Sequence, residues 1–210
     1  MPAPAFDLYL VTDRTQTRGH DLLWVLEQAL AGGVKAVQLR EKDLGGKELF
    51  HLAEKTRNLC ERYDAALFIN DRVDVALGVD AAGVQLGKAS LPIETARSLL
   101  GPHKLIGASI HSLMEGQQAE RAGADFVLFG PVYFTPSKAA FGAPQGLASL
   151  AKIVEMLSLP VYAIGGVTPD NTTSVQCVGA RGVALIAAIM GAEKPQDAAQ
   201  TMVRLLRSCC

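Results

Sequence analysis

Several features that direct a chain to particular classes of protein are missing from this sequence. Its 210 residues carry 20 Lys and Arg against 21 Asp and Glu, so no excess of positive charge favours nucleic acid or a membrane surface. The longest stretch without a charge, Met156 to Pro169, is too short to span a bilayer and contains Pro160. The N-terminus has no basic segment followed by an apolar one, so we expect no signal peptide.

Cysteine is also scarce. The chain has four cysteines, and none has CxxC or metal-ligand spacing. Cys60 and Cys177 lie in helical patterns, whereas Cys209 and Cys210 end the chain. We expect reduced thiols in a cytoplasmic protein.

The sequence is rich in apolar residues, which make up 49% of the chain and lie in short runs. Several runs are apolar at consecutive positions, which is typical of strands buried on both faces of a parallel sheet. The eight runs are Phe6 to Thr12, Ala36 to Arg40, Leu67 to Asn70, Gly83 to Leu86, Leu105 to Ser109, Phe126 to Phe129, Val161 to Ile164 and Val183 to Ile186.

Helical patterns separate these runs, and several begin with proline or follow a glycine-containing turn. Strands alternating with helices predict an α/β fold, and eight of them in a chain of this length predict a single-domain (β/α)8 TIM barrel over residues 1–210. A doubly wound open sheet is the alternative, but no GxGxxG motif follows the first run. The helical patterns are Asp21 to Ala31, Lys47 to Tyr63, a segment from Pro92, Leu113 to Ala122, Leu147 to Leu157, Pro169 to Val178 and Pro195 to Arg207.

Polar residues cluster at the carboxyl ends of the predicted strands, where such a barrel places its ligand site. Cations gathered at one opening are costly unless an anion neutralises them, so a phosphorylated substrate with more than one phosphate is indicated. The residues at these ends are Thr12, Asp13, Gln38, Arg40, Lys42, Asn70, Asp71, Arg72, Gln85, Lys88, Ser109, His111, Thr135, Ser137, Lys138, Gly165, Gly166 and Ala187.

Each of these groups also has a structural interpretation. Gln38, Arg40 and Lys42 alternate along VQLREKD and could form an interior polar layer with a surface salt bridge instead of an anion site. Asp71 could hold Mg2+ beside a diphosphate, or could cap the helix that begins near Val73.

The later strand ends carry similar alternatives. Thr135, Ser137 and Lys138 suit phosphate capture on a closing loop, but also suit an ordinary solvated loop. The pair Gly165-Gly166 allows a phosphate to approach backbone N–H groups after the seventh strand. His111 is an acid/base candidate because it follows the fifth strand, although a lone His is usually structural.

Taken together, these segments make the chain similar to the thiamine phosphate synthase family and its close relatives, the thiazole tautomerases. The resemblance covers nearly the whole chain. The segments that carry it are YLVTD (Tyr9 to Asp13), VQLREKD (Val37 to Asp43), INDRVDVAL (Ile69 to Leu77), GVQLGKASLP (Gly83 to Pro92), IGASIHS (Ile106 to Ser112), GADFVLFGPVYFTPSK (Gly123 to Lys138) and AIGGVTPDN (Ala163 to Asn171).

The resemblance implies a (β/α)8 barrel that joins hydroxymethylpyrimidine diphosphate to a thiazole phosphate and releases diphosphate with Mg2+ as cofactor. It further implies that Asp71 is a Mg2+ ligand and that Ser109 contacts the pyrimidine. Thiazole-phosphate contacts are implied at Thr135, Ser137, Gly166, Ile186 and Ala187, and diphosphate and pyrimidine-side contacts at Gln38, Arg40, Lys42, Asn70 and Lys138. On this basis the expected catalytic residues are Arg40, Lys42, Lys138 and His111.

Three positions in two segments depart from the synthase pattern. Ser90 stands where the family has its second acidic metal ligand, and Gln85 stands where it has His. Ala187 replaces a Ser that usually binds phosphate. Gln85 and the IHS segment around His111 are closer to the tautomerases, but tautomerases tend to lose the cationic and acidic groups retained here.

Three functions therefore remain open. We prefer a transferase, thiamine phosphate synthase; the alternatives are a thiazole tautomerase that uses His111 to move a proton, and a catalytically silent binder of phosphorylated ligands. The expected partners are phosphorylated pyrimidine and thiazole compounds, with no nucleic acid and no membrane, and a homo-oligomer is compatible with the sequence.

Overall fold

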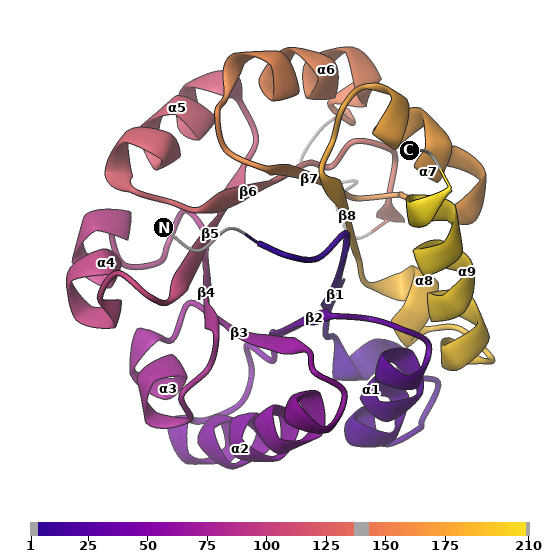
Figure 1. Ribbon diagram of the computed structural model, residues 1–210. Helices are drawn as coiled ribbons and strands as arrows, with labels where there is room; N and C mark the ends of the chain where they lie inside the picture. Colours follow the sequence, from indigo (N-terminus) through magenta and orange to yellow (C-terminus); the bar gives the residue numbers. More distant parts are fainter. Residues whose placement is uncertain (1–3, 137–142, 209–210) are drawn as a thin grey trace.

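The computed structural model describes residues 4–136 and 143–208, which form a closed barrel of eight parallel strands. Each strand pairs with its neighbours in sequence, and β1 closes the barrel against β8 (Figure 1). The predicted (β/α)8 barrel is therefore confirmed. The strands are β1 (Leu8–Val11), β2 (Ala36–Leu39), β3 (Ala66–Asn70), β4 (Gly83–Leu86), β5 (Leu105–Ile110), β6 (Phe126–Phe129), β7 (Val161–Ile164) and β8 (Gly182–Leu185).

Helices surround the strands as an outer ring (Figure 1). A short 3-10 helix, η1 (Arg14–Gln16), follows β1. The α-helices are α1 (Leu22–Ala31), α2 (Gly46–Arg62), α3 (Val73–Gly78), α4 (Ile93–Leu100), α5 (Leu113–Ala122), α6 (Gly146–Met156), α7 (Pro169–Cys177), α8 (Ala187–Met190) and α9 (Pro195–Arg207).

Local sequence explains where these helices begin and which face they bury. Asp21 accepts hydrogen bonds from the backbone N–H groups of Leu23 and Trp24 and so caps α1. Ser112 caps α5 in the same way, and Gly123 ends that helix in the left-handed conformation. The apolar stripes of the helices pack on the outer surface of the strands, where they form the larger core cluster.

A second core cluster fills the inside of the barrel near the amino ends of the strands. Phe6 lies 5.1 Å from Tyr162 and 5.4 Å from Tyr9, measured between ring centroids, and Phe68 and Phe126 complete the group. The Tyr162 hydroxyl donates to the Phe6 carbonyl over 2.7 Å. These five rings close the barrel at this end, so its interior opens toward the carboxyl ends of the strands.

Several strand ends differ by one residue from the sequence expectation, and two further differences affect the barrel floor and the site. The first run was expected to be extended from Phe6, but β1 begins at Leu8 because Phe6 packs beneath the barrel against the rings of Tyr9 and Tyr162. Ala187 was expected at a strand end, but it is the first residue of the short helix α8. No helix in the described part of the chain is long and apolar enough to cross a membrane.

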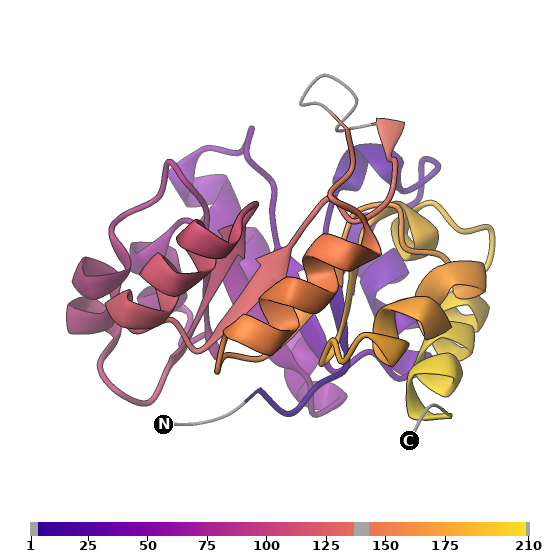
Figure 2. The same ribbon diagram turned by 90° about the horizontal axis from the view of Figure 1, so that it is seen from above.

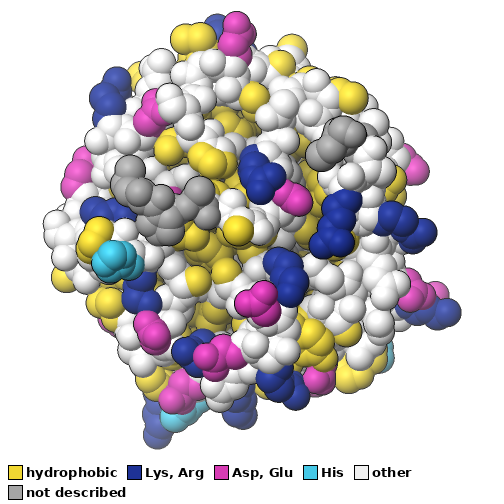
Figure 3. All heavy atoms as spheres, in the orientation of Figure 1, with side chains coloured by type: hydrophobic (Ala, Val, Ile, Leu, Met, Phe, Trp, Pro, Cys, Tyr) yellow, Lys and Arg dark blue, Asp and Glu magenta, His cyan; other side chains and the backbone are white. Residues whose placement is uncertain are grey.

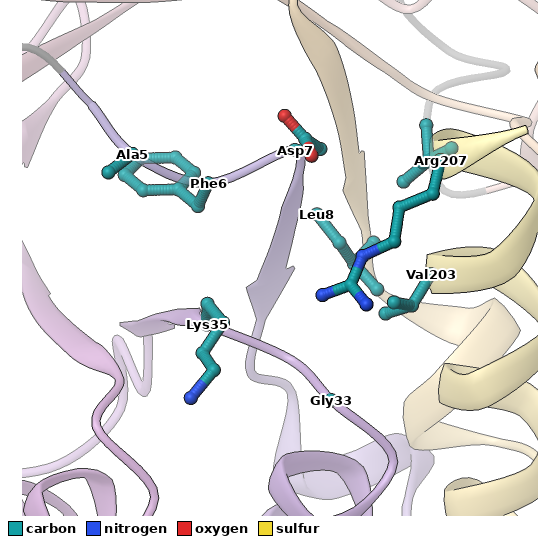
Figure 4. A pocket seen from close by; sticks show the side chains of 9 residues that line it. Ala5, Phe6, Asp7, Leu8, Gly33, Lys35, Val203 and Arg207 are labelled. Carbon is teal, nitrogen blue, oxygen red and sulfur yellow. The ribbon is translucent and has the colours of Figure 1, made fainter. Parts of the chain in front are cut away.

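The carboxyl ends of the strands, at the top of Figure 2, lie opposite the end at which β1 begins and α9 finishes. Figure 3 views that opposite face, where Lys and Arg side chains surround apolar ones. A hollow of about 70 Å3 lies there, with Lys35, Asp7 and Arg207 around it (Figure 4). Lys35 donates to the Tyr63 carbonyl and Asp7 pairs with Arg181. Because this hollow lies at the amino ends of the strands, it is separate from the predicted site at their carboxyl ends.

Candidate functional site

Amide side chains from neighbouring strands meet inside the upper barrel. The Gln38 side chain on β2 donates to Asn70 Oδ1 on β3 over 2.7 Å, and Gln85 on β4 donates to Ser109 Oγ on β5 over 3.0 Å. The Oε1 atoms of Gln38 and Gln85 are buried and have no hydrogen-bond partner among the described residues. Since an unpaired buried oxygen is costly, both atoms are ready acceptors for a donor on a ligand or for a water.

Asp71 follows β3 in the left-handed conformation, with φ 61°. Its Oδ2 atom accepts a hydrogen bond from the Asn70 side chain over 2.6 Å, and its Oδ1 atom contacts the Ser90 hydroxyl. Ser90 Oγ in turn accepts from the backbone N–H of Gly87 over 2.7 Å. The carboxylate therefore does not cap α3, whose N-cap residue is Arg72, and the helix-cap interpretation of Asp71 is wrong.

Arg40 and Lys42 extend from the carboxyl end of β2. Arg40 is half-buried and Lys42 is exposed. Neither cation has an ion pair or a side-chain hydrogen bond within the described residues, whereas Glu41 between them is buried. The alternating pattern thus leaves two free positive charges at the barrel opening, beside the strand that carries Asn70 and Asp71.

Two carboxyl groups on this side of the opening, Asp13 and Glu41, have displaced pKa values. Burial acts to raise the pKa of Asp13, but hydrogen bonds from Thr15 and Gln16 and the charge of Arg40 lower it below its usual range. For Glu41, burial outweighs the hydrogen bonds from Thr12 and Arg14 and raises the pKa. The positive field of Arg40 therefore reaches the end of β1.

His111 follows β5 and is exposed. Its Nδ1 atom lies 2.6 Å from the Gly130 carbonyl oxygen, and its backbone N–H donates to Glu115 over 2.6 Å. Because a carbonyl only accepts, Nδ1 is the donor in this contact, and Nε2 is the ring nitrogen left for a ligand. The imidazole is thus oriented, as acid/base chemistry requires.

On the other side of the opening, the Gly165-Gly166 turn packs tightly against the loop after β6. Both glycines have positive φ, 94° and 64°. A Cβ on Gly166 would lie 2.5 Å from the Phe134 carbonyl oxygen, and one on Gly165 would lie 2.5 Å from Pro131 Cβ. The glycines are therefore required by packing as well as by any approach of a ligand.

Asn171 fixes the same turn. Its Oδ1 atom accepts from the Thr168 backbone N–H over 2.9 Å, and its Nδ2 group donates to the Gly166 carbonyl over 3.0 Å. Thr135 and the β8–α8 junction, Ile186 and Ala187, also belong to this side of the barrel. Two predicted residues, Ser137 and Lys138, lie outside the described residues.

The structure corrects one expected member of the site and adds others. Arg72 was expected to face the common cavity, but its side chain pairs with Asp74 at 2.6 Å and so lacks a free charge. Glu41, Glu115 and Asn171 were not singled out. The alternation of Arg40-Glu41-Lys42 was the available signal for Glu41, because its side chain must point away from the two cations.

The acidic groups suit a metal ion only in part. Among residues 4–136 and 143–208, no three His, Cys, Asp or Glu side chains come together as a metal cluster. Asp71 supplies one carboxylate, and the Ser90 hydroxyl stands beside it. Mg2+ commonly takes one or two carboxylates together with substrate phosphates, so this arrangement fits an ion that arrives with a phosphorylated ligand.

Comparisons with known proteins agree with this geometry. A putative thiamine-phosphate synthase of Geobacter sulfurreducens is 50% identical over 96% of this chain and 94% of its own length. The thiamine-phosphate synthase of Clostridium novyi is 40% identical over 95% of this chain and 98% of its own length. A solved thiamine phosphate pyrophosphorylase from Pyrococcus furiosus superposes with a TM-score of 0.89 at 40% identity, covering 97% of this chain and 96% of that one.

The family model described as thiamine monophosphate synthase matches residues 8–189, from the first strand to the short helix after the last. This match includes both sides of the barrel opening, with the amides, the free cations and the glycine turn. The chain therefore belongs to the thiamine monophosphate synthase family.

Proposed function

We propose that this protein is a transferase of thiamine biosynthesis that condenses hydroxymethylpyrimidine diphosphate with a thiazole phosphate. The C–O bond to the diphosphate breaks, the thiazole nitrogen forms a C–N bond to the same carbon, and thiamine phosphate and diphosphate are the products. The observation that carries this proposal is the pair of free cations, Arg40 and Lys42, beside Asp71 at the barrel opening. They are suited to the negative charge that grows on a departing diphosphate.

The β2–β5 side would hold the pyrimidine diphosphate. Arg40 and Lys42, with Lys138 from outside the described residues, would bind the diphosphate. The unpaired Oε1 atom of Gln38 would accept a hydrogen bond from the amino group of the pyrimidine, while Asn70 and Ser109 bound its remaining edge. No protein nucleophile is needed, because the residues stabilise the leaving group and align the two rings.

Asp71 would hold Mg2+ together with the diphosphate. The ion would supply additional positive charge to the leaving group. Because Ser90 offers a neutral hydroxyl in place of a second carboxylate, Asp71 is the only acidic ligand among the predicted site residues. We expect weak Mg2+ binding until the diphosphate completes the coordination shell.

The β6–β8 side would hold the thiazole phosphate. Gly166 and Thr135 lie after β7 and β6, and Ile186 and Ala187 begin α8. Backbone N–H groups in such a position are suited to a phosphate, as in other barrels that bind phosphate after strands seven and eight. Ser137, which lies outside the described residues, is the remaining proposed contact.

The decisive experiment incubates the purified protein with both phosphorylated precursors and Mg2+ and measures thiamine phosphate and released diphosphate. We expect both products, in equal amounts, and a large loss of rate when Mg2+ is chelated. Binding of the precursors without product at any Mg2+ concentration would instead identify a catalytically silent binder.

A second candidate, a thiazole tautomerase, is favoured by the oriented imidazole of His111. The His111 ring would remove a proton at one atom of a carboxythiazole phosphate and deliver it at another. Incubation with that compound without Mg2+ tests this alternative. Conversion that is abolished by His111→Asn and retained by Arg40→Ala, without thiamine phosphate formation, would replace the synthase proposal.

Domain organisation, localisation and oligomeric state remain to be tested. We propose that residues 1–210 form one domain that works in the cytoplasm, where reduced Cys60 and Cys177 would be stable. Self-association to a homo-oligomer is proposed as compatible with this role, and sedimentation of the purified protein would test it.

A further inference from the structure

The segment that carries Arg40 and Lys42 is tied to the end of β1 through a buried carboxylate. Glu41 Oε1 accepts a hydrogen bond from the Thr12 hydroxyl over 2.6 Å. Its Oε2 atom accepts from the Arg14 backbone N–H over 3.3 Å and lies 3.6 Å from Arg14 Nη1. The Glu41 side chain is only 3% exposed.

Thr12 connects this carboxylate to the backbone of Arg40. Its hydroxyl oxygen accepts a hydrogen bond from the Arg40 N–H over 2.9 Å while its proton goes to Glu41. The Thr12 N–H also donates to the Gln38 carbonyl over 2.9 Å, in register with the barrel. One buried residue directly after β1 therefore holds the backbone at Gln38 and Arg40 and the side chain of Glu41.

A buried carboxylate at this place needs an explanation. Removing a charge from water is costly, and partial pairing with Arg14 does not remove that cost, since burial still raises the pKa of Glu41. Moreover, a negative charge next to Arg40 and Lys42 opposes the binding of an anion. What the carboxylate contributes is orientation. Gln38 lies inside the barrel and Leu39 packs on its outer side, so the same alternation directs Glu41 away from the interior and Arg40 and Lys42 toward the opening.

We propose that Thr12 and Glu41 are positioning residues, which fix the β2 segment so that Arg40 and Lys42 are already aimed at the diphosphate before it binds. This inference rests on the proposed function, since it assumes that an anion binds these cations. Neither residue needs to contact the substrate.

Because Glu41 is negatively charged, its effect on the orientation of Arg40 and Lys42 can be distinguished from its electrostatic effect on a bound anion. Glu41→Gln removes a negative charge near an anion site, so electrostatics alone would tighten anion binding. Loss of orientation would weaken it, because the amide replaces one of the two carboxylate oxygens, which accept from the Thr12 hydroxyl and from the Arg14 backbone N–H, with a group that only donates. Asp43→Asn is the control, since it removes a charge from the same segment at a side chain that is 65% exposed. Asp43 pairs with Arg14 Nη2, so this variant also loses one Arg14 contact but keeps the Thr12–Glu41 hydrogen bond.

The test measures binding of inorganic diphosphate with Mg2+ by calorimetry. We expect Glu41→Gln to weaken binding by roughly 10–100-fold, the range for losing a partner that orients a ligand-binding group. Asp43→Asn should bind equally or more tightly. Equal or tighter binding by Glu41→Gln would overturn the inference. Absence of binding to the unaltered protein would overturn the proposed function, and this inference with it.

Thr12 provides a second pair of variants if Glu41→Gln does not fold. Thr12→Val should weaken diphosphate binding, whereas Thr12→Ser, which keeps the hydroxyl, should restore it. Thr56→Val controls for the loss of a buried hydroxyl, because Thr56 is fully buried in α2 and donates only to the Leu52 carbonyl. Equal weakening in Thr56→Val and Thr12→Val would overturn the inference.

Discussion

The two sides of the barrel opening are built from different chemical groups. On the β2–β5 side, the available ligand-binding groups are side chains. Amides donate to an amide and to a hydroxyl on the neighbouring strands, and Arg40, Lys42 and Asp71 supply charge. On the β6–β8 side, the prominent features are glycines, a short helix and backbone N–H groups. Ligand binding on the first side should therefore depend on side-chain chemistry, whereas binding on the second side should depend on backbone conformation.

The largest expected effect tests the charge on the first side. Arg40→Ala should lower kcat by roughly 10²-fold or more, because it removes positive charge where negative charge develops. Lys138→Ala should act in the same direction. His111→Asn is the control and should retain most synthase activity, since the transfer has no obligatory imidazole. Steady-state rates at saturating substrates measure all three, and unaltered turnover of Arg40→Ala would remove it from the mechanism.

A glycine substitution tests the second side. Gly166→Ala places a methyl group 2.5 Å from the Phe134 carbonyl oxygen at a φ of 64°. We expect this overpacking to cost about 1–3 kcal/mol beyond the conformational cost, with loss of thiazole-phosphate affinity.

Gly123→Ala is the control for that substitution. Gly123 also has a positive φ, 92°, but among the described residues nothing beyond its chain neighbours lies within 4 Å of the place a Cβ would take, so only the conformational cost of about 1–2 kcal/mol applies. Chemical denaturation measures both variants. If Gly166→Ala is no less stable than Gly123→Ala, the packing argument fails.

Ser90→Asp adds a second carboxylate to the first side, beside Asp71. A second carboxylate beside Asp71 repels it, so we expect the variant to unfold at a lower temperature without Mg2+ and to regain stability when Mg2+ is added. The Mg2+ concentration for half-maximal activity should fall by about tenfold, as expected when an added ligand contributes roughly 1.4 kcal/mol. Tight binding of Mg2+ to the substrate-free, unaltered protein would contradict this interpretation of Ser90.

The smallest effect concerns Arg72, a cation of the first side that is already paired. Arg72→Gln should leave kcat/KM nearly unchanged, in contrast with Arg40→Ala, and should cost under about 1 kcal/mol because the pair is exposed to solvent. Hydrogen bonding to Arg72 lowers the pKa of Asp74 from 3.8. The contribution of this pair to the free energy of unfolding is thus present above pH 3.8 and is lost as the pH falls through the lowered pKa of Asp74. Stability curves at pH 7 and pH 2.5 test this difference.

Most of the fold could be predicted from the sequence. Continuous apolar runs such as Phe126 to Phe129 and glycine-containing turns such as Gly123 mark strands and helix ends by local physical rules. Phe6 could not be placed, because its apolar character suits a strand and a barrel floor equally. Tertiary contact with Tyr9 and Tyr162 decides between the two.

The site was predictable as a region but not in its connections. Strand ends converge in any barrel, which is why Arg40, Asn70 and His111 could be assigned to one opening. The resemblance implied that Asp71 and Ser90 lie at one metal site, but their direct contact depends on a left-handed turn and on a loop after another strand, which no local pattern encodes. Glu41, lying between two cations, resembles a solvated charge until the Thr12 hydroxyl is placed beside it.

The ring cluster beneath the barrel also decides how ligands reach the interior. Phe6, Tyr9, Phe68, Phe126 and Tyr162 fill the barrel at the amino ends of the strands. Within the described part of the chain, both substrates and both products would therefore pass through the same opening at the carboxyl ends, so a product that stays bound there would slow the entry of the next substrate.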